Sequence, residues 1–151
     1  MNNTKTTRST AKLRLEQFLQ ICLGLTSERD REQLLSDILD KAMFLNNCDA
    51  GTLYLLEDDG LHFSRMVTKS IGLRQGGHAD PISFPPVPLE PQYVASYAVM
   101  LNETVHIDNV REDPRFDFSG SKRYDEMTGY HTGSMLVVPM SNGKGDIIGV
   151  T

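Results

Sequence analysis

Apolar residues change their spacing near Asp49, and this change restricts the chain to folds in which helices precede a sheet of short strands. Before Asp49 apolar residues recur at every third or fourth position, as they do on one face of an amphipathic helix. Ser27 and Asp30, spaced like a capping box, separate two such stripes and mark the start of the second helix. The stripes consist of Leu15, Phe18, Leu19, Cys22 and Leu25, then Leu34, Leu35, Ile38, Leu39, Ala42 and Leu45.

After Asp49 the sequence breaks into short β-rich runs separated by turn residues. Residues 52–56 and 61–69 flank Asp58, Asp59 and Gly60, a pattern that predicts a β-hairpin. Further strands are expected over residues 104–107, 134–140 and 146–151.

Two long stretches of this second part lack a regular apolar period. Residues 70–89 contain too many glycines and prolines for a helix or a central strand. A short helix is expected from Pro91, a favoured first helical residue, to Asn102. Residues 108–129 are expected to be largely irregular, with about one helical turn.

This order of elements predicts an α+β fold in which the N-terminal helices cover one face of a central antiparallel sheet. The sheet is expected to have about five or six strands, with Leu53, Leu55, Val137 and Ile148 buried. A length of 151 residues fits one domain. We expect a disordered polar tail over residues 1–10 and a single domain over 11–151, truncated within its final strand.

Charge and hydropathy exclude several classes of partner. The net charge is −5 and the Lys and Arg residues are scattered, so nucleic acid is not expected as a partner. No apolar run approaches the ~20 residues that cross a membrane, and no apolar stretch follows the N-terminus as in a secretory signal. We therefore expect a cytoplasmic protein without a membrane partner.

The motifs of common catalytic and metal sites are missing from the sequence. It has no glycine-rich phosphate loop, no HExxH pair and no CxxC. Its two cysteines, Cys22 and Cys48, adjoin helical pattern, where a thiol acts as a small apolar group. Neither a catalytic nor a metal site is expected, because the histidines lack metal-ligand spacing: His62, His78, His106 and His131.

The segment from Asn109 to Val150 carries a recognisable series of motifs. It reads N-V-R-E-D-P-R-F, then Y-D-E-M-T-G-Y-H-T-G-S-M-L-V-V-P-M, then D-I-I-G-V. This resembles GAF domains, particularly those of cyclic-nucleotide phosphodiesterases and adenylyl cyclases, whose signature contains Asn-Lys, Phe, Asp-Glu and Thr-Gly-Tyr or Thr-Gly-Phe. Asn109, Phe116, Asp125 and Glu126 occupy the corresponding positions, and the similarity extends back through the strand that begins near Cys48.

The resemblance implies a ligand pocket between the sheet and a lid formed by a loop and a short helix. Val110 replaces the signature lysine, and residues from Phe118 onward lengthen the spacing between Phe116 and Asp125. Cyclic AMP or cyclic GMP is the candidate ligand that the family suggests. The positions expected to face the ligand are Thr52, Val94, Ala95, Asp125, Thr128 and Thr132.

A purely structural interpretation of the same residues stays open at this point. Phe116 and Tyr130 would then be core aromatics, Thr128 and Gly129 ordinary turn residues, and Asp125 the cap of a short helix.

Three functions are compatible with the family. We expect a regulatory domain that senses a small molecule within a larger signal-transduction protein and has no catalysis of its own. The first alternative is a dimerisation or protein-interaction module with a vestigial pocket. The second is an enzyme that reduces free methionine sulfoxide, which the positions of Cys22 and Cys48 disfavour. The stripe from Leu15 to Leu25 further predicts a homodimer formed through the N-terminal helices.

Overall fold

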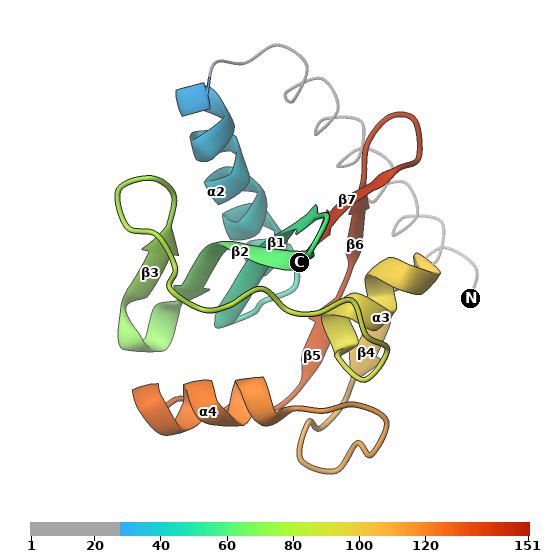
Figure 1. Cartoon of the computed structure of the whole chain (residues 1–151). Coiled ribbons are helices and arrows are strands. Elements are labelled where there is room, and N and C mark those ends of the chain that lie inside the picture. The colour runs from blue at the N-terminus through green and yellow to red at the C-terminus, as the bar shows by residue number, and fades with distance from the viewer. Residues whose placement is uncertain (1–27) are drawn as a thin grey trace, which may run out of the picture.

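A computed structural model describes residues 28–151, and Figure 1 shows their arrangement. The tail expected over residues 1–10 and the first expected helix lie outside these described residues. No helix within the described part is long and apolar enough to cross a membrane. In chain order the elements are α2 (Glu28–Leu45), β1 (Ala50–Glu57), β2 (Gly60–Thr68), η1 (Lys69–Ile71), β3 (Leu73–Gly76), α3 (Val94–Leu101), β4 (Val105–Ile107), α4 (Ser119–Thr128), β5 (Met135–Val137), β6 (Pro139–Ser141) and β7 (Ile147–Val150).

The strands form an antiparallel sheet of five strands in the order β3-β2-β1-β7-β6, with a separate pair β4-β5 beside it. The α+β fold and the number of strands are therefore as predicted. The hairpin is also confirmed, since Glu57 pairs with Gly60 across the Asp58-Asp59 turn.

Three segments differ from their predicted structure. The run over 134–140 forms two strands because Met135–Val137 pairs with β4, whereas Pro139–Ser141 pairs with β7. The stretch over 70–89 contains the edge strand β3, which pairs with β2. The segment over 108–129 contains the ten-residue helix α4 instead of one turn, and α4 has no buried residue, so it left no apolar period to detect.

The helix α2 covers one face of the sheet by packing on β1 and β2. Side chains alternate along β1, so Leu53 and Leu55 point toward α2 while Thr52 and Tyr54 point to the opposite face. Gly51 allows the close approach, because a Cβ atom there would lie 2.8 Å from Met43. The buried members of this core are Leu34, Leu35, Ile38, Leu39, Met43, Leu53, Val67 and Met140.

Two of the four residues expected in the core are less buried than predicted. Leu53 and Val137 are buried, whereas Leu55 and Ile148 are only partly buried. Both lie at the margin of the α2 core. Ile148 belongs to β7, and within the described residues α2 packs mainly on β1 and β2.

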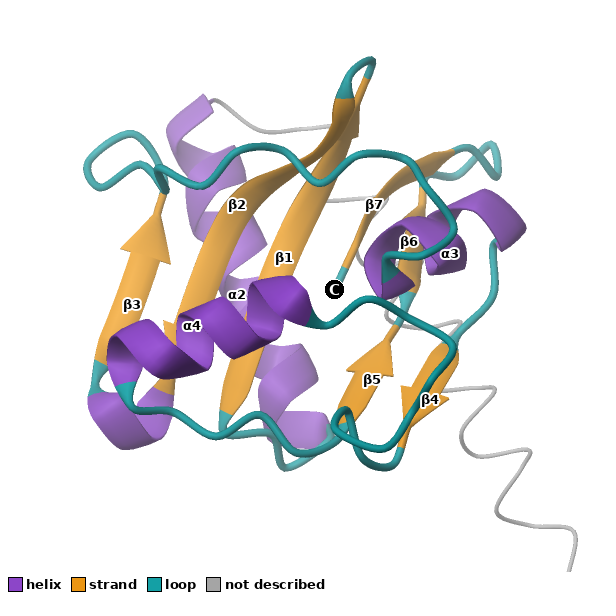
Figure 2. Ribbon diagram, turned by 60° about the horizontal axis from the view of Figure 1, so that its bottom comes forward, coloured by secondary structure: helices purple, strands orange, loops and turns teal. Residues whose placement is uncertain are grey.

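The opposite face of the sheet carries the second core and the lid. Figure 2 shows α4 in front of β1 and β2, with α2 behind the sheet and α3 beside β6. The second core joins α3, β4 and β5 to this face, with Leu61, Ala98, Ile107 and Val150 fully buried. The expected short-helix lid opposite the N-terminal helical face is therefore present.

Candidate functional site

Two tyrosines attach the lid to the end of the sheet. The Tyr124 hydroxyl and the Thr68 Oγ1 atom are 2.7 Å apart, which joins α4 to the buried last residue of β2. Tyr124 and Tyr130 meet edge to face with ring centroids 6.3 Å apart. The pKa of Tyr130 is raised by burial first, then by the charge of Asp49 and a hydrogen bond to it. Tyr130 therefore lies against Asp49, just before β1 begins.

Asp125 joins the last turn of α4 to Thr132 in the segment that follows the helix. Its Oδ2 atom accepts a hydrogen bond from the Thr132 backbone N–H at 2.8 Å, and its Oδ1 atom accepts one from the Thr132 hydroxyl at 2.7 Å. A carboxylate held by two donors is well satisfied without a cationic partner. We call this pair of bonds the Asp125–Thr132 clasp.

The clasp uses both oxygens of Asp125, and Val110 stands where the family signature has a lysine. Val110, which replaces that lysine, is buried, and its backbone N–H donates to the Gly133 carbonyl at 2.8 Å. The neighbouring Arg111 contacts His131, with Nη2 and Nδ1 3.2 Å apart. Thr132 thus takes the role of hydrogen-bond partner to Asp125 in this chain.

Thr128 takes part in ending α4. Its hydroxyl donates to the Tyr124 carbonyl at 2.8 Å and accepts from the Tyr130 backbone N–H at 3.3 Å. Gly129 follows in the left-handed region with φ of 74°, a backbone conformation that glycine adopts without strain. These contacts match the structural role considered for Thr128 and Gly129 in the sequence.

The first half of the signature forms a tightly bonded loop. The Asn109 Oδ1 atom accepts from the Arg111 backbone N–H at 3.0 Å. Arg115 forms a two-pronged ion pair with Asp113, its shortest distance 2.6 Å, and lowers the pKa of that carboxyl through hydrogen bonds. The Arg115 guanidinium lies 5.3 Å from the centroid of the Phe116 ring.

Phe116 joins this loop to α3. Its ring meets Tyr97 edge to face at 5.2 Å between centroids, and it packs against the second core. The Asp117 backbone N–H donates to the Gln92 carbonyl at 2.7 Å. Phe116 therefore acts as a core aromatic that holds the signature loop against the start of α3, while Glu126 is exposed.

The remaining expected ligand positions lie on two separate elements. Ala50 pairs with Thr68, so Thr52, two residues further along β1, shares the face to which Tyr124 is attached. Val94 and Ala95 lie in the first turn of α3 and pack partly buried against the second core. Asp125, Thr128 and Thr132 thus gather at the end of α4, Thr52 faces the lid, and Val94 and Ala95 lie on the adjoining helix.

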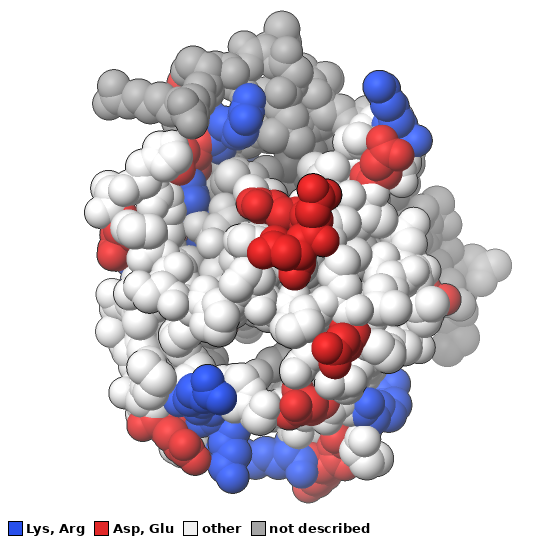
Figure 3. Space-filling model, viewed as in Figure 1, with Lys and Arg blue, Asp and Glu red and all other residues white. Residues whose placement is uncertain are grey.

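The surface beside the lid is hollowed in two places. Figure 3 shows a hollow between α4 and the strands above it. A wide pocket of about 580 Å³ also opens between the signature loop and the start of β5. Most of its lining residues are of polar type, and one of them, Thr132, belongs to the clasp. The lining consists of Asp108, Asn109, Arg111, His131, Thr132, Gly133 and Ser134.

Thr68, Asp49 and Tyr124 were not expected at the site from the sequence, and Tyr130 was considered only as a core aromatic. Tyr124 and Tyr130 flank the Thr-Gly motif, and two aromatics so close to a signature were the available signal. Thr68 and Asp49 had no such signal, because their partners are distant in the sequence. Thr68 contacts Tyr124, 56 positions later, and Asp49 contacts Tyr130, which follows the lid helix.

The sequence pattern that defines the GAF domain matches residues 30–151. The chain belongs to the GAF domain family. It is 29% identical over 137 residues to the dual 3′,5′-cyclic-AMP and -GMP phosphodiesterase 11A of Takifugu rubripes, covering 89% of this chain and 15% of that protein. It is 28% identical over 147 residues to a cGMP-specific 3′,5′-cyclic phosphodiesterase of Drosophila pseudoobscura pseudoobscura, covering 89% of this chain and 12% of that protein. The chain thus spans only a small part of these relatives.

Solved GAF structures share the fold of this domain. The GAF domain of a phosphoenolpyruvate-protein phosphotransferase from Coxiella burnetii superimposes with a TM-score of 0.59 at 12% identity, covering 91% of this chain and 73% of that one. A GAF sensor protein from Burkholderia vietnamiensis gives a TM-score of 0.53 at 16% identity, covering 94% of this chain and 73% of that one. At this level of identity the likeness concerns the fold alone.

Proposed function

We propose that this GAF domain is a regulatory module of a larger signal-transduction protein and binds a small molecule between α4 and the facing side of the sheet. The observation that carries the proposal is the Asp125–Thr132 clasp at the end of a lid helix that lies over a hollow. A lid attached by a few polar contacts, with no buried residue of its own, can open at low cost and respond to a ligand.

A domain without catalysis of its own fits the described side chains. Cys48, the cysteine within the described residues, packs partly buried against the α2 core, on the face of the sheet opposite the lid. A thiol there is separated by the sheet from a ligand held under α4. A nucleophile would have to face that ligand, within reach of a base.

Cyclic AMP or cyclic GMP is the ligand class that we propose first. The support is the relationship to phosphodiesterases named for these nucleotides, together with hydroxyl groups on both sides of the proposed site. Thr52 lies on the sheet and Thr132 in the segment after the lid, and hydroxyls can donate to or accept from the polar edges of a nucleotide.

Calorimetric titration of both nucleotides into the protein tests this proposal. Asp125→Ala removes the clasp and is expected to weaken binding at least tenfold, since about 1.4 kcal/mol corresponds to a factor of ten and two hydrogen bonds are lost. Glu126→Ala is the matched control, because Glu126 is the adjacent acidic residue, is exposed, and lies on the same helix. It should bind as the wild type does.

Thr128→Val refines the same experiment. Removing one hydroxyl that ends the lid helix should weaken binding several-fold, in line with about 0.5–1.5 kcal/mol for one hydrogen bond. Absence of heat and of thermal stabilisation at millimolar nucleotide would reject cyclic nucleotides as the ligand. Equal effects of Asp125→Ala and Glu126→Ala would reject the site.

A dimerisation or protein-interaction module is the second candidate function, and α2 favours it. Phe44 is 80% exposed and Leu45 67% exposed at the end of this helix. Large apolar side chains adjacent to one another on a surface are typical of contact sites. We propose that the domain forms a homodimer through its N-terminal helical region.

A further inference from the structure

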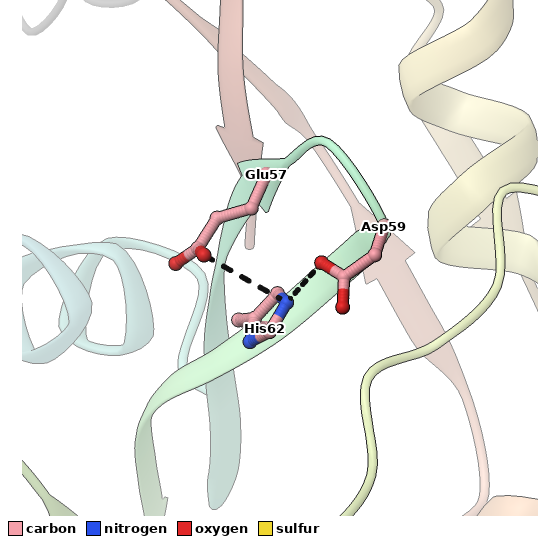
Figure 4. Close-up of side chains that lie close together, drawn as sticks. All are labelled: Glu57, Asp59 and His62. Carbon is pink, nitrogen blue, oxygen red and sulfur yellow. Dashed lines mark hydrogen bonds and ion pairs between the residues drawn. The ribbon is translucent and has the colours of Figure 1, made fainter.

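The turn between β1 and β2 brings a histidine and two carboxylates to one point, away from the lid. His62 lies directly opposite Leu55, so Glu57, two residues beyond Leu55, is its diagonal neighbour on the same face. Asp59 belongs to the two-residue turn. Figure 4 shows both carboxylates directed at the His62 Nε2 atom, with Asp59 Oδ1 at 2.6 Å and Glu57 Oε2 at 3.8 Å.

A proton on the His62 Nε2 atom can form a hydrogen bond with only one of the two carboxylates. The Nε2 atom carries at most one hydrogen, which the bond to Asp59 uses. Glu57, at 3.8 Å from the same nitrogen, is beyond hydrogen-bonding distance. A cation in place of that hydrogen would contact the imidazole nitrogen and both carboxylates together.

The donor atoms lie close enough together for small side-chain rotations to bring them around one cation. One ligand atom from each residue lies within 4.8 Å of the other two. A metal ion bound at about 2.0–2.2 Å from each needs ligand atoms somewhat closer than this. Glu57 and Asp59 are exposed and free to rotate inward, with side-chain exposures of 58% and 70%.

The surrounding charge also favours a cation. Glu57, Asp58 and Asp59 are three consecutive exposed acidic residues at the turn. Figure 3 shows a red patch with no blue side chain beside it at the place where Figure 1 has the turn between β1 and β2. The like charges repel one another, and a divalent cation would relieve that repulsion.

We propose that Glu57, Asp59 and His62 form a binding site for a divalent transition-metal cation, which we call the hairpin site. The imidazole favours Zn²⁺, Co²⁺ or Ni²⁺ over Mg²⁺ and Ca²⁺, which prefer oxygen ligands alone, and the two carboxylates also suit Mn²⁺. Three protein ligands leave further coordination positions for water or for a donor atom of another molecule. The hairpin site is separate from the ligand site under α4, so either proposal can fail without the other.

Paramagnetic NMR of the full chain tests the hairpin site directly. We choose Mn²⁺ as the probe because the thiols of Cys22 and Cys48 compete for softer metals such as Zn²⁺. Substoichiometric Mn²⁺ should broaden the backbone amide signals of residues 57–62 before those of other regions. Broadening centred elsewhere, or none at millimolar Mn²⁺, would overturn the proposal.

Three variants separate a built site from general attraction to an acidic surface. His62→Gln and Glu57→Gln each remove one ligand. Loss of a residue that only supports a ligand lowers metal affinity by about 10- to 100-fold, so we expect a reduction at least as large here. His106→Gln is the matched control, because within residues 28–151 His106 pairs with one carboxylate, Asp108 at 3.5 Å. It should leave the broadening at residues 57–62 unchanged.

Thermal unfolding of each variant confirms that the fold is retained. Glu57 is exposed at the turn, so Glu57→Gln should leave the melting temperature unchanged and decides the question even if His62→Gln were destabilised. Broadening that persists undiminished in Glu57→Gln would show attraction by charge alone and would overturn the site.

Discussion

At the scale of single residues, Arg65 shows how a charged side chain can serve the core of this domain. It is the one buried charged residue among residues 30–151. Its Nε atom donates to the Ser36 hydroxyl at 2.9 Å and its Nη2 atom to the Glu32 carbonyl at 2.9 Å. Burial of an arginine is tolerated where its donors are satisfied in this way, and here the bonds join β2 to α2.

Replacing Arg65 should therefore cost more stability than replacing an exposed arginine at the same interface. Arg65→Ala removes the hydrogen bonds to Ser36 and Glu32 together with the buried stem of the side chain, and we expect the free energy of unfolding to fall by about 1–3 kcal/mol. Arg74→Ala is the control: Arg74 also reaches α2, through Asp40 at 2.8 Å, but is 58% exposed, so its loss should cost at most about 1 kcal/mol. Denaturation with urea measures both, and similar losses would contradict the role given to burial.

At the scale of elements, α4 differs from α2 and α3 in how it is held. The helix α2 contributes five buried residues to its core and α3 contributes Ala98 and Val99 to the other, whereas α4 has none. Its position depends on the Tyr124 hydroxyl, the ring of Tyr130 and the Asp125–Thr132 clasp. Elements held by few buried contacts open locally before the rest of a domain does.

Tyr124→Phe should loosen α4 while leaving the sheet intact. The change removes the bond to Thr68, a contribution of about 0.5–1.5 kcal/mol. We expect faster amide hydrogen exchange over residues 119–128 and unchanged exchange in β1 and β2.

Tyr97→Phe provides the comparison, because it removes a hydroxyl from α3 instead of α4. Equal acceleration of exchange in α4 by both changes would argue against the Tyr124 attachment.

At the scale of the whole molecule, the sheet separates two cores and two surfaces. The face covered by α4 carries the proposed ligand site, and the face covered by α2 leads to the exposed Phe44 and Leu45. A ligand that repositions α4 acts on the same sheet against which α2 packs. This arrangement would let the lid and a helical dimer interface influence one another.

The proposed homodimer makes a direct prediction for sedimentation. Phe18→Glu combined with Leu25→Glu places charges in the N-terminal apolar stripe, and burial of unpaired charge should dissociate the dimer into monomers. Met127→Glu, which adds the same charge on the exposed side of α4, should leave the dimer intact. Analytical ultracentrifugation distinguishes these states, and a monomeric wild type at high concentration would reject the interface.

Part of the candidate site could be predicted from local sequence. The signature residues Asn109, Phe116 and Asp125 were identified from their order and residue types, and Thr132 lies in the same motif. Their partners were not predictable in this way. The bond between Thr68 and Tyr124 joins residues 56 positions apart, and the approach of Glu57 to His62 depends on the register of the hairpin.

The sequence by itself determined the α+β fold, the first hairpin, the strands that flank it and the family, because apolar period and turn residues are local properties of the chain. Only the tertiary structure decided that the run over 134–140 forms two strands, of which β5 pairs with β4 and β6 with β7. It also decided that α4 extends from Ser119 to Thr128 and that Asp125 binds Thr132. Those outcomes depend on which distant groups meet once the cores have packed. Hydrogen bonds and strand pairings of that kind leave no period in the sequence.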